Sequence, residues 1–375
     1  MKVVLVSRYP HSYNTPRGGV ESVTLILARA LADLAGIDVH VVTIEKGHTE
    51  TRQEQDGAVT IHRLPGSHCP QIFDIVKGPG KKRIHEKIKE LSPDIVHYHE
   101  TYGLIPGNLN VPQVFTVHGF DHANVVTEGR DILHLRSKLW QWMENYGLAR
   151  QKVIISISPY VRNMIEQKTS APIYDIDNPV DGHFFSLEPN CDERRVLCVG
   201  WINERKNTLG SVKAFIAARK QGAEGKLVIA GHAKDSEYRK KIDQEIIGAG
   251  IEDHVEFLGH VNREQLTEQL ALASCLLLPS LQENAPMAIS EAMASSVAVV
   301  ASNRCGMPFM VEDGRSGFLV DPLDTEQIGR CLARVLGDPD ICTSFGQAGR
   351  EIARQRFHPE TVARKTVEVY KQHLL

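Results

Sequence analysis

Residues 177–183 read Asp177-Asn178-Pro179-Val180-Asp181-Gly182-His183, a polar stretch that divides the chain into two halves of the same kind. Asn, Asp, Pro and Gly favour turns, and their concentration here is typical of a connection between domains. A length of 375 residues also exceeds the usual size of one domain. We therefore predict one domain over residues 1–180 and a second over residues 181–356.

On both sides of this stretch, short runs of β-branched residues alternate with longer amphipathic segments. Before it, we expect strands at 2–7, 38–44, 58–64, 94–98, 113–118 and 153–157, and helices near 20–35, 81–91 and 131–149. After it, we expect strands at 195–200, 226–230, 255–258, 275–279, 297–301 and 318–320, and helices near 207–221, 236–249, 263–272, 285–295 and 324–336. The alternation predicts an α/β fold with two Rossmann-like, doubly wound domains. If these domains face each other, ligands bind in a cleft at the carboxyl ends of their strands.

The composition excludes several classes of protein. Hydrophobic residues make up 42% and charged residues 24% of the chain, which is ordinary for a globular protein. A formal net charge of -3 gives no overall attraction to nucleic acid. The cysteines are scattered without a CxxC pair, which argues against a disulfide framework and against a zinc site. No segment reaches the roughly 20 apolar residues of a membrane span, so we expect a cytoplasmic protein with at most peripheral contact at the inner membrane face.

Two motifs in the first half fit a phosphate or sugar ligand. Arg17-Gly18-Gly19-Val20-Glu21 precedes an amphipathic helix, where paired glycines let a phosphate approach the backbone N–H groups. The spacing matches neither a P-loop nor the GxGxxG fingerprint. His118, in Thr116-Val117-His118-Gly119, ends a predicted strand and would face the cleft. A flexible turn and a loop-capping histidine explain these two motifs equally well.

A basic pair follows the first predicted strand of the second half. Arg205 and Lys206 stand five and six residues after Gly200. Together they could neutralise a diphosphate, with the guanidinium as a fork and the ammonium as a point charge. An isolated Arg-Lys pair in a loop is more often solvated surface.

The most informative stretch is Glu283-Asn284-Ala285-Pro286-Met287-Ala288-Ile289-Ser290-Glu291-Ala292-Met293-Ala294. Eight positions are just over two helical turns, so the two glutamates can face the same side. Between them lies the backbone of Ala285, Pro286, Met287 and Ala288, at the predicted start of a helix. Carboxylates that accept from hydroxyls, beside N–H groups that meet phosphate or sugar oxygens, suit a polyhydroxy ligand. A surface glutamate and a helix glutamate paired with an arginine explain the spacing equally well.

The order of these motifs resembles glycosyltransferase family 4. The matching segments are GGVE at 18–21, PDIVHYH at 93–99, TVHGFD at 116–121, the glycine and basic pair at 200–206, VEFLG at 255–259, the paired glutamates with EAMA at 283–294, and CGMP and VEDG at 305–314. They span about residues 1–322 in the expected order. The pair of glutamates with its EAMA tail is the most specific piece. The resemblance implies the GT-B fold, with residues 357–375 forming a helix that crosses back to the first domain.

The resemblance also implies a role for each matching residue in binding a nucleotide-diphosphate sugar. Glu291 corresponds to the glutamate that binds the ribose hydroxyls, and Glu283 to the one near the transferred sugar. The other implied contacts are the diphosphate for Arg205 and Lys206, the phosphates for Gly18 and Gly19, the donor sugar for His118, and the base for the backbone near Gly259 and Val261.

Three positions depart from the family pattern. Trp201 stands where an arginine often follows the glycine, which leaves activation of the leaving group in question. Cys305-Gly306-Met307-Pro308-Phe309 replaces the usual Gly-Gly-x-Pro-Glu, and Asn178-Pro179-Val180-Asp181 replaces Asn-Gly-Val-Asp. These two differences concern loop contacts and leave the predicted fold unchanged.

The family resemblance implies a glycosyltransferase that retains the anomeric configuration and needs no cofactor besides its nucleotide sugar. No carboxylate is placed as a nucleophile, so we expect departure and attack on one face of the sugar. No Asp-x-Asp motif is present near the donor site, so we expect no metal ion there. A catalytically silent sugar-nucleotide-binding or scaffold subunit and another GT-B enzyme, such as a nucleotide-sugar epimerase, remain alternatives.

The acceptor class follows only from the resemblance: a glycan, a lipid-linked precursor or a small molecule. Two segments could contact a membrane. Residues 77–89 carry six Lys and Arg residues with an apolar stripe, although a solvated helix has the same pattern. The apolar residues of 132–148 are expected mainly to pack inward, with one exposed tryptophan at most.

Overall fold

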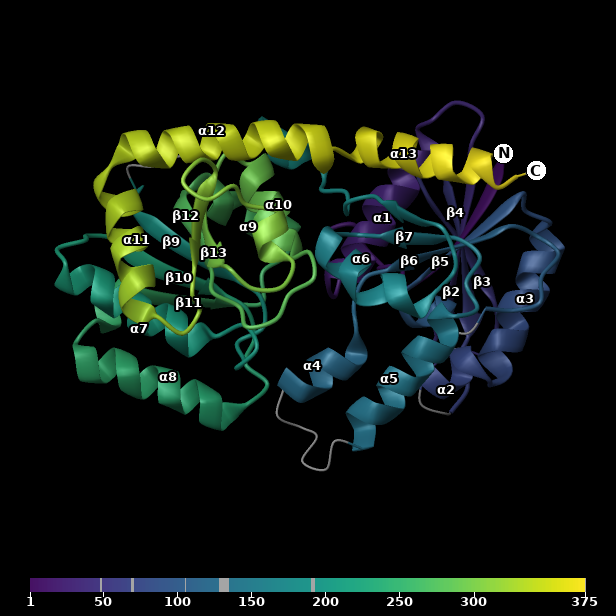
Figure 1. Cartoon of the computed structure of the whole chain (residues 1–375), viewed down its shortest axis with the longest axis horizontal. Coiled ribbons are helices and arrows are strands. Elements are labelled where there is room, and N and C mark those ends of the chain that lie inside the picture. Colours follow the sequence, from purple (N-terminus) through teal and green to yellow (C-terminus); the bar gives the residue numbers. More distant parts are fainter. Residues whose placement is uncertain (48, 69–70, 105, 128–134, 190–192, 375) are drawn as a thin grey trace. The chain divides into compact units, whose positions relative to one another are not determined.

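The computed structural model describes residues 1–375 except 48, 69–70, 105, 128–134, 190–192 and 375. The chain divides into two compact units. Unit 1 contains residues 1–122, 135–179 and 359–375, and unit 2 contains residues 123–134 and 180–358. Each unit is built around its own parallel β-sheet (Figure 1).

The sheet of unit 1 has the strand order β3-β4-β2-β1-β5-β6-β7-β8. The strands are β1 (Lys2–Val6), β2 (Asp38–Glu45), β3 (Arg52–Asp56), β4 (Val59–Pro65), β5 (Ile95–His99), β6 (Gln113–Val117), β7 (Ile154–Ser156) and β8 (Ile173–Asp175). All neighbours pair in parallel except β3 and β4, which are antiparallel. Strand β1 is buried on both sides because Val3 to Val6 are all apolar and completely covered.

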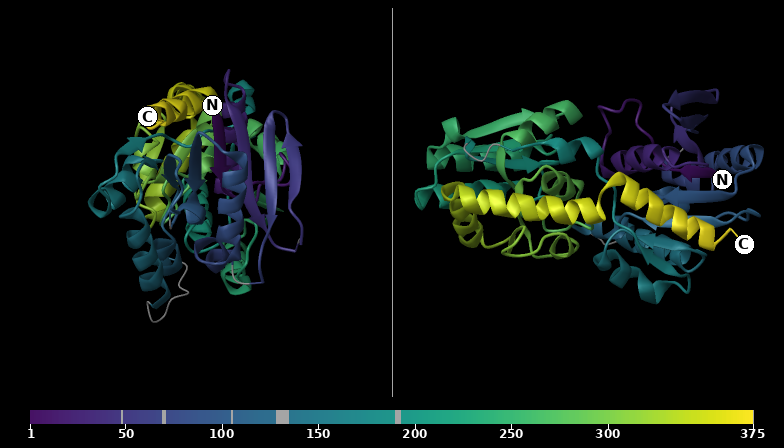
Figure 2. Two further views of the ribbon diagram at one scale, coloured as in Figure 1. Left: turned by 90° about the vertical axis from the view of Figure 1, so that its right-hand side faces the viewer. Right: turned by 90° about the horizontal axis from the view of Figure 1, so that it is seen from above.

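Helices cover both faces of this sheet. They are α1 (Gly19–Ala32), α2 (Gln71–Val76), α3 (Pro79–Leu91), α5 (Leu135–Leu148), α6 (Pro159–Ile165) and α13 (Pro359–Gln372), whereas most of α4 (Asp121–Thr127) belongs to unit 2. The last helix, α13, packs beside α1, the first helix of the chain (Figure 2). Its buried residues include Val362, Val367, Val369 and Tyr370, so the end of the chain completes the core of unit 1. The predicted helix over 131–149 begins in part at residues 131–134, which lie outside the described residues.

The sheet of unit 2 is parallel throughout, with the strand order β11-β10-β9-β12-β13-β14. The strands are β9 (Arg195–Val199), β10 (Lys226–Ala230), β11 (Val255–Gly259), β12 (Ala273–Leu278), β13 (Ala298–Ser302) and β14 (Gly317–Val320). The helices are α7 (Thr208–Lys220), α8 (Ser236–Ala249), α9 (Arg263–Ala271), α10 (Met287–Ala294), α11 (Thr325–Gly337) and α12 (Pro339–Arg356). Successive residues of β9 point into different cores, Val196 and Cys198 toward α7 and α11, and Leu197 toward α10 and α12. The sheet is therefore covered on both faces, as a doubly wound fold requires.

Two of the places where the chain passes between the units, after residues 179 and 358, lie next to each other. The backbone N–H of Val180 donates a hydrogen bond to the carbonyl oxygen of Phe357 over 2.9 Å. Beyond Val180 the chain enters the sheet of unit 2, and beyond Phe357 it enters α13 of unit 1. A backbone hydrogen bond thus joins the two ends of the segment 180–358 of unit 2.

The cysteines of the described part of the chain are of two kinds. Cys198, Cys275, Cys305 and Cys331 are free thiols, whereas Cys342 is disulfide-bonded. Cys69 and Cys191 lie outside the described residues. Burial raises the pKa of the Cys198 thiol to about 12, so this side chain behaves as a small core residue.

Candidate functional site

The loop after β9 places two cations at the carboxyl end of the sheet of unit 2. Gly200 has a positive φ of 134°, and a Cβ built on it would lie 3.0 Å from Cε and 3.4 Å from Nζ of Lys206. The Lys206 side chain therefore passes directly over the bare Cα of Gly200. Asn203 fixes the turn, because its Oδ1 accepts a hydrogen bond of 2.9 Å from the Lys206 backbone N–H.

One carboxylate oxygen holds both cations of this loop. Oε1 of Glu283 accepts from Nη1 of Arg205 at 2.6 Å and from Nζ of Lys206 at 2.8 Å. The side chain of Glu283 is 12% exposed. Burial opposes its ionisation, but the charges of Lys206 and Arg205 and their hydrogen bonds outweigh burial and hold the pKa of Glu283 below its usual value. The structure thus brings Glu283 into contact with Arg205 and Lys206, an adjacent pair that lies more than 70 positions earlier in the sequence.

The backbone around Glu283 is held as tightly as its side chain. The carbonyl oxygen of Gln282 accepts from Nη1 of Arg205, and the N–H of Gly306 donates to the carbonyl oxygen of Glu283 over 2.8 Å. A Cβ on Gly306 would lie only 1.8 Å from the backbone oxygen of Asn284, so only glycine fits there. The loop that replaces the usual Gly-Gly-x-Pro-Glu therefore keeps the glycine that touches the Glu283 segment.

Helix α10 begins directly after this loop. Pro286 is its N-cap residue, and Met287 and Ala288 form its first turn. N–H groups in the first turn of a helix have no acceptor within the helix, so they point outward as free donors toward the preceding loop. Ala285 stands one residue before the cap and is partly buried. Ala288 itself is buried in the core around α10.

Glu291 lies one helical turn before the end of α10, and its surroundings differ from those of Glu283. Burial raises the pKa of Glu291 to about 7, while the charges of Arg263, His183 and Lys206 act in the opposite direction. Lys206 therefore acts on both glutamates, by direct contact with Glu283 and through its field on Glu291. Glu291 therefore keeps its proton to a higher pH than an exposed glutamate does.

A buried network beside Glu291 contains residues that the motifs did not indicate. Nη1 of Arg263 lies 2.6 Å from Oδ2 of Asp181, and Nδ1 of His183 lies 2.8 Å from Oδ1 of the same carboxylate. Nε2 of His183 is 2.9 Å from Oγ1 of Thr267. Arg263 is the first residue of α9, and its side chain is only 7% exposed. The nearest signal in the sequence is Asp181 in the connecting stretch, which gave no indication of its partner.

The remaining predicted residues of unit 2 lie at the ends of strands. Gly259 ends β11 with a φ of +67°, a conformation that favours glycine. Val261 follows and packs partly against the core around α10. Trp201 is 42% exposed, and Nζ of Lys234 lies 4.0 Å from the centroid of its ring. The position of the missing arginine is thus occupied by an aromatic ring with a lysine over its face.

In unit 1 the predicted glycine loop begins α1. Gly18 caps the helix, with a φ of 150°, and both Gly18 and Gly19 are exposed. Oε2 of Glu21 accepts from the Arg17 backbone N–H at 2.7 Å. The backbone is accessible as predicted, but a carboxylate already occupies one N–H group of this loop.

His118 follows β6 and lies against a second histidine. Its Nε2 is 2.9 Å from Nδ1 of His99, which ends the neighbouring strand β5. The His99 ring lies in turn against His97, with 4.2 Å between ring centroids and 32° between the ring planes. Burial lowers the pKa of His118 to about 4, so the imidazole is neutral at physiological pH. Residues 97 and 99 share one face of β5 because side chains alternate along a strand.

Two carboxyl groups of unit 1, those of Asp121 and Glu100, interact with each other and have raised pKa values. Burial, with the charges of Glu100 and Glu144, raises the pKa of Asp121 to about 6. Burial also raises the pKa of Glu100, whose carboxylate lies 3.3 Å from Nε of Arg8. Glu144 from α5 accepts from the backbone N–H of Asp121 at 2.8 Å and so begins α4. Asp121 ends the motif TVHGFD at 116–121, whereas Glu100 lies outside the recognised motifs.

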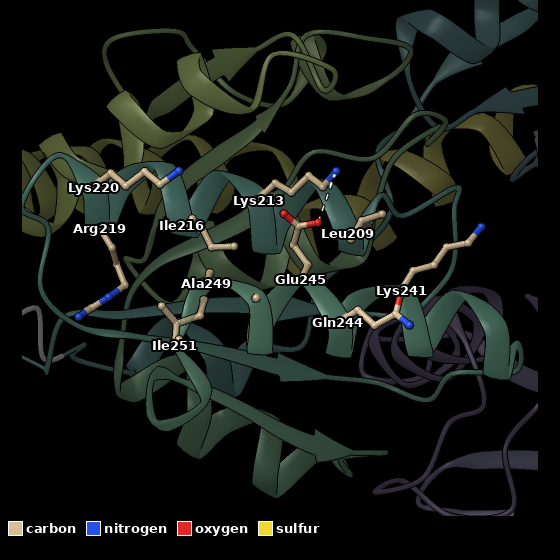
Figure 3. A pocket seen from close by; sticks show the side chains of 12 residues that line it. Leu209, Lys213, Ile216, Arg219, Lys220, Lys241, Gln244, Glu245, Ala249 and Ile251 are labelled. Carbon is tan, nitrogen blue, oxygen red and sulfur yellow. Dashed lines mark ion pairs between the residues drawn. The ribbon is translucent and has the colours of Figure 1, made fainter.

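A groove of about 970 Å³ lies elsewhere in unit 2, between α7 and α8 (Figure 3). Its cations are Lys213, Arg219, Lys220 and Lys241, and Lys213 points toward Glu245 with 3.6 Å between the charged atoms. Its described lining includes none of the residues predicted to bind a donor. These lysines therefore serve as matched controls for Lys206.

The two segments considered for membrane contact behave in opposite ways. In α3, Ile84 and Ile88 are buried in unit 1, and exposed lysines pair with glutamates, as Lys82 does with Glu86.

In α5, the expectation of an inward apolar face is wrong. Leu135, Leu139, Trp142 and Tyr146 are 67%, 53%, 60% and 37% exposed. The inner face of α5 is formed by small and polar residues, including Ser137, Glu144 and Gly147, which leave the large side chains outside.

No described helix is both long and apolar enough to cross a membrane. Within the same residues, no group of three or more His, Cys, Asp and Glu side chains could hold a metal ion.

Both units match known protein families. Residues 17–183 match the family model of Glycosyltransferase Family 4, and residues 180–352 match that of Glycosyl transferases group 1. The two matches meet at the stretch that separates the halves of the chain. Together they cover the predicted site residues of both units.

Known proteins with related sequences or structures agree with this assignment. The alpha-maltose-1-phosphate synthase of Mycolicibacterium smegmatis is 27% identical over 322 residues, which are 74% of this chain and 79% of that protein. A GDP-mannose-dependent phosphatidylinositol monomannoside mannosyltransferase of Mycobacterium tuberculosis is 29% identical over 180 residues, which are 46% of each chain. The structure of the sucrose-phosphate synthase from Thermosynechococcus elongatus superposes with a TM-score of 0.82, at 21% identity, over 99% of this chain and 98% of that one.

The family matches, the two Rossmann-like sheets and the likeness to GT-B structures lead to one conclusion. This chain belongs to glycosyltransferase family 4 and is a glycosyltransferase that takes its sugar from a nucleotide sugar.

Proposed function

We propose that the chain is a retaining glycosyltransferase whose donor is a nucleotide-diphosphate sugar bound by unit 2. The observation that carries this proposal is the contact of one buried carboxylate, Glu283, with both Arg205 and Lys206. Two cations on one carboxylate leave a net positive site, which attracts the charge that develops on a departing diphosphate. A surface pair, in contrast, would be solvated and separate.

The other residues of unit 2 have roles that fit the same donor. Glu291 accepts hydrogen bonds from the ribose hydroxyls, and the backbone near Gly259 and Val261 reads the base. The N–H groups of Met287 and Ala288, together with the backbone of Ala285 and Pro286, meet oxygens of the phosphate or the sugar. In unit 1, Gly18 and Gly19 face the phosphates, and His118 orients the donor sugar.

The reaction proceeds on one face of the sugar. The bond from the anomeric carbon to the diphosphate oxygen breaks while the acceptor oxygen bonds to that carbon from the same side. The acceptor proton passes to the departing diphosphate. Glu283 is unsuited to be a nucleophile because two cations already share one of its oxygens. Arg205 and Lys206 supply positive charge that a metal ion supplies elsewhere, and we expect turnover to survive EDTA.

The proposal is tested by thermal shift with UDP, GDP and ADP. One of the three should raise the melting temperature of the wild type. The variants Lys206→Ala and Glu291→Ala should each need at least ten times more nucleotide for the same shift. Lys241→Ala, a lysine of the α7–α8 groove, should behave as the wild type. Transfer from the matching nucleotide sugar should give a product with the donor's anomeric configuration. No shift with any nucleotide, or an inverted product, would disprove the proposal.

For the acceptor we propose a lipid-linked molecule reached at an anionic membrane surface through α5. Positions 135, 139, 142 and 146 follow a spacing of four, three and four residues, so their exposed apolar side chains form one stripe. Trp142 and Tyr146 stack with 5.5 Å between centroids, and aromatic residues of this kind favour the membrane interface.

The charges around this stripe favour an anionic partner. The exposed charged residues of 135–152 are Arg136, Lys138, Arg150 and Lys152, all cations, whereas the acidic side chain of Glu144 is buried. An apolar stripe flanked only by cations matches anionic lipid headgroups. The mannosyltransferase relative named above acts on a phosphatidylinositol derivative, which agrees with such an acceptor.

Co-sedimentation with phosphatidylcholine vesicles, with and without phosphatidylglycerol, tests this surface. The wild type should bind only the anionic vesicles, and the double variant Leu139→Gln/Trp142→Gln should lose most of that binding. Lys82→Gln in α3 removes an exposed cation without touching α5 and should bind normally. Equal binding of the double variant, or binding lost equally in Lys82→Gln, would disprove the role of α5.

A further inference from the structure

We propose that His99 is a positioning residue that fixes the tautomer of His118, so that His118 carries its proton on Nδ1. The assignment of the proton stands on the geometry of unit 1. Its consequence for catalysis rests on the proposed function, in which His118 lies beside the donor sugar.

The two imidazoles share one hydrogen bond. Nδ1 of His99 lies 2.9 Å from Nε2 of His118, and the rings stack at 20° with centroids 5.2 Å apart. A neutral imidazole has one N–H donor and one acceptor nitrogen. One of these two facing nitrogens must therefore carry the proton, and the other must not.

The burial of His99 decides which nitrogen is the donor. This residue is 0% exposed, and its Nε2 has no hydrogen-bond partner among the described residues. A proton on Nε2 would leave an N–H group buried without an acceptor, which native structures rarely tolerate. A proton on Nδ1 is used in the bond to His118 and leaves only a lone pair unsatisfied, which costs less. Nδ1 of His99 is then the donor, Nε2 of His118 accepts, and the His118 proton is on Nδ1.

The surroundings keep His99 in this orientation. The His97 ring contacts that of His99, with 4.2 Å between centroids, and is itself fixed at both nitrogens, by the hydroxyl of Tyr370 at 2.6 Å and by that of Thr116 at 2.6 Å. Burial lowers the pKa of His97 to about 3 and that of His118 to about 4. These histidines therefore stay neutral, and the tautomer persists throughout the physiological range of pH.

The consequence is that His118 presents a hydrogen-bond donor, not an acceptor, to the sugar. A hydroxyl or phosphate oxygen that reaches Nδ1 of His118 meets a donor and must accept. The opposite tautomer would present a lone pair there and require a hydrogen from the ligand. The His99 contact thus selects how a ligand oxygen is oriented, without touching the ligand.

Long-range ¹H–¹⁵N correlation spectra of protein labelled with ¹⁵N-histidine test the assignment, with the His118 signals identified by their loss in His118→Gln. We expect the Nδ1-protonated form in the free wild type. His99→Phe removes the donor and should move His118 toward the Nε2-protonated form, while His99→Asn, whose amide nitrogen can replace Nδ1, should restore the wild-type pattern. An Nε2-protonated His118 in the wild type, or no change in His99→Phe, would overturn the inference.

Kinetics give a second readout that keeps the two proposals apart. In His99→Phe, kcat should fall about tenfold, the size of one neutral hydrogen bond, and His99→Asn should recover it. Binding of the nucleoside diphosphate by unit 2 should be unchanged in both, which also shows that the variants fold. If the spectra agree but kcat stays at the wild-type value, the tautomer is correct and the proposed role of His118 at the sugar is wrong.

Discussion

Nζ of Lys206 lies 2.8 Å from Oε1 of Glu283, the same oxygen that contacts Arg205. One negative charge therefore holds two positive charges in the free protein, and a diphosphate must share these cations with Glu283. The carboxylate has two effects: it preorganises the cations and it limits how tightly they bind the product.

Glu283→Gln should separate these two effects. Loss of the charge leaves two partly buried cations without a counter-charge and should lower the free energy of unfolding by about 3 kcal/mol. Turnover should fall by about a hundredfold, because the cations are no longer positioned. The nucleoside diphosphate should bind at least as tightly as in the wild type, because its phosphates no longer compete with the carboxylate. Urea unfolding, initial rates and calorimetry measure the three quantities.

A matched control is Glu237→Gln, which removes an exposed partner of Lys240 at 2.8 Å. It should change the unfolding free energy by less than about 1 kcal/mol. Much weaker binding of the nucleotide to Glu283→Gln would show that the carboxylate contacts the ligand directly and that this account of competition is wrong.

The raised pKa of Glu291 predicts a pH dependence of both stability and binding. Its pKa rises from 4.5 to about 7 on folding, mainly through burial. The folded state therefore binds more protons than the unfolded state between these values, and stability from this group is lost as pH rises through 7. The loss should amount to about 3 kcal/mol relative to Glu291→Gln. Nucleotide affinity should rise over the same range, because the ionised carboxylate is the better acceptor for ribose hydroxyls.

Melting temperatures of the wild type and Glu291→Gln between pH 5 and pH 8 measure this difference. As pH rises, the melting temperature of the wild type should fall relative to that of Glu291→Gln. Added nucleotide should reverse this fall, because it stabilises the wild type and not the variant. Parallel pH profiles would contradict the assignment of this pKa.

Gly306→Ala tests the close contact behind Glu283. The new Cβ would meet the Asn284 carbonyl oxygen at 1.8 Å, and backbone cannot move aside as a flexible side chain can. We expect a loss of about 1–3 kcal/mol in unfolding free energy and a larger relative loss of turnover, because the 283–285 segment must shift. Gly248→Ala, in open space on α8, should be neutral or stabilising by up to about 1 kcal/mol. Equal behaviour of the two variants would refute the steric argument.

Tyr370→Phe tests the anchoring of the last helix. The buried hydroxyl bonds to His97 at 2.6 Å, and its removal leaves a buried nitrogen without its partner. Denaturant unfolding should show a loss of about 1–3 kcal/mol. Tyr174→Phe removes a partly exposed hydroxyl that bonds to Gln372 at 2.9 Å, and it should cost less than half as much. A smaller loss of unfolding free energy in Tyr370→Phe than in Tyr174→Phe would show that the Tyr370 hydroxyl does not anchor α13.

Periodicity predicted the regular elements of the fold well because most strands are buried on both faces. The strand at 226–230 and the helix at 236–249 match β10 and α8 residue for residue. Strand β3, Arg-Gln-Glu-Gln-Asp at 52–56, went unpredicted because an exposed antiparallel edge needs no apolar residues. Helix α12 was also missed.

The candidate site was predictable only where its residues form local motifs. Glu283, Arg205 and Lys206 follow strands within recognisable patterns, and the structure brings them into contact. Arg263 could not be assigned, because its partner Asp181 lies 82 positions away and such pairing depends on the tertiary fold. The exposed face of α5 was predicted wrongly for a related reason: the inner face is small and polar, so amphipathicity alone gave the opposite orientation.

The contribution of α13 to unit 1 bears on the order in which the protein forms during synthesis. Nearly all of unit 2 is one continuous segment, and its two ends are joined by the bond between Val180 and Phe357. Unit 1 is synthesised first, but its core lacks Val362, Val367 and Tyr370 until α13 has been made. During synthesis the segment 180–358 of unit 2 is therefore complete before unit 1 can complete its core.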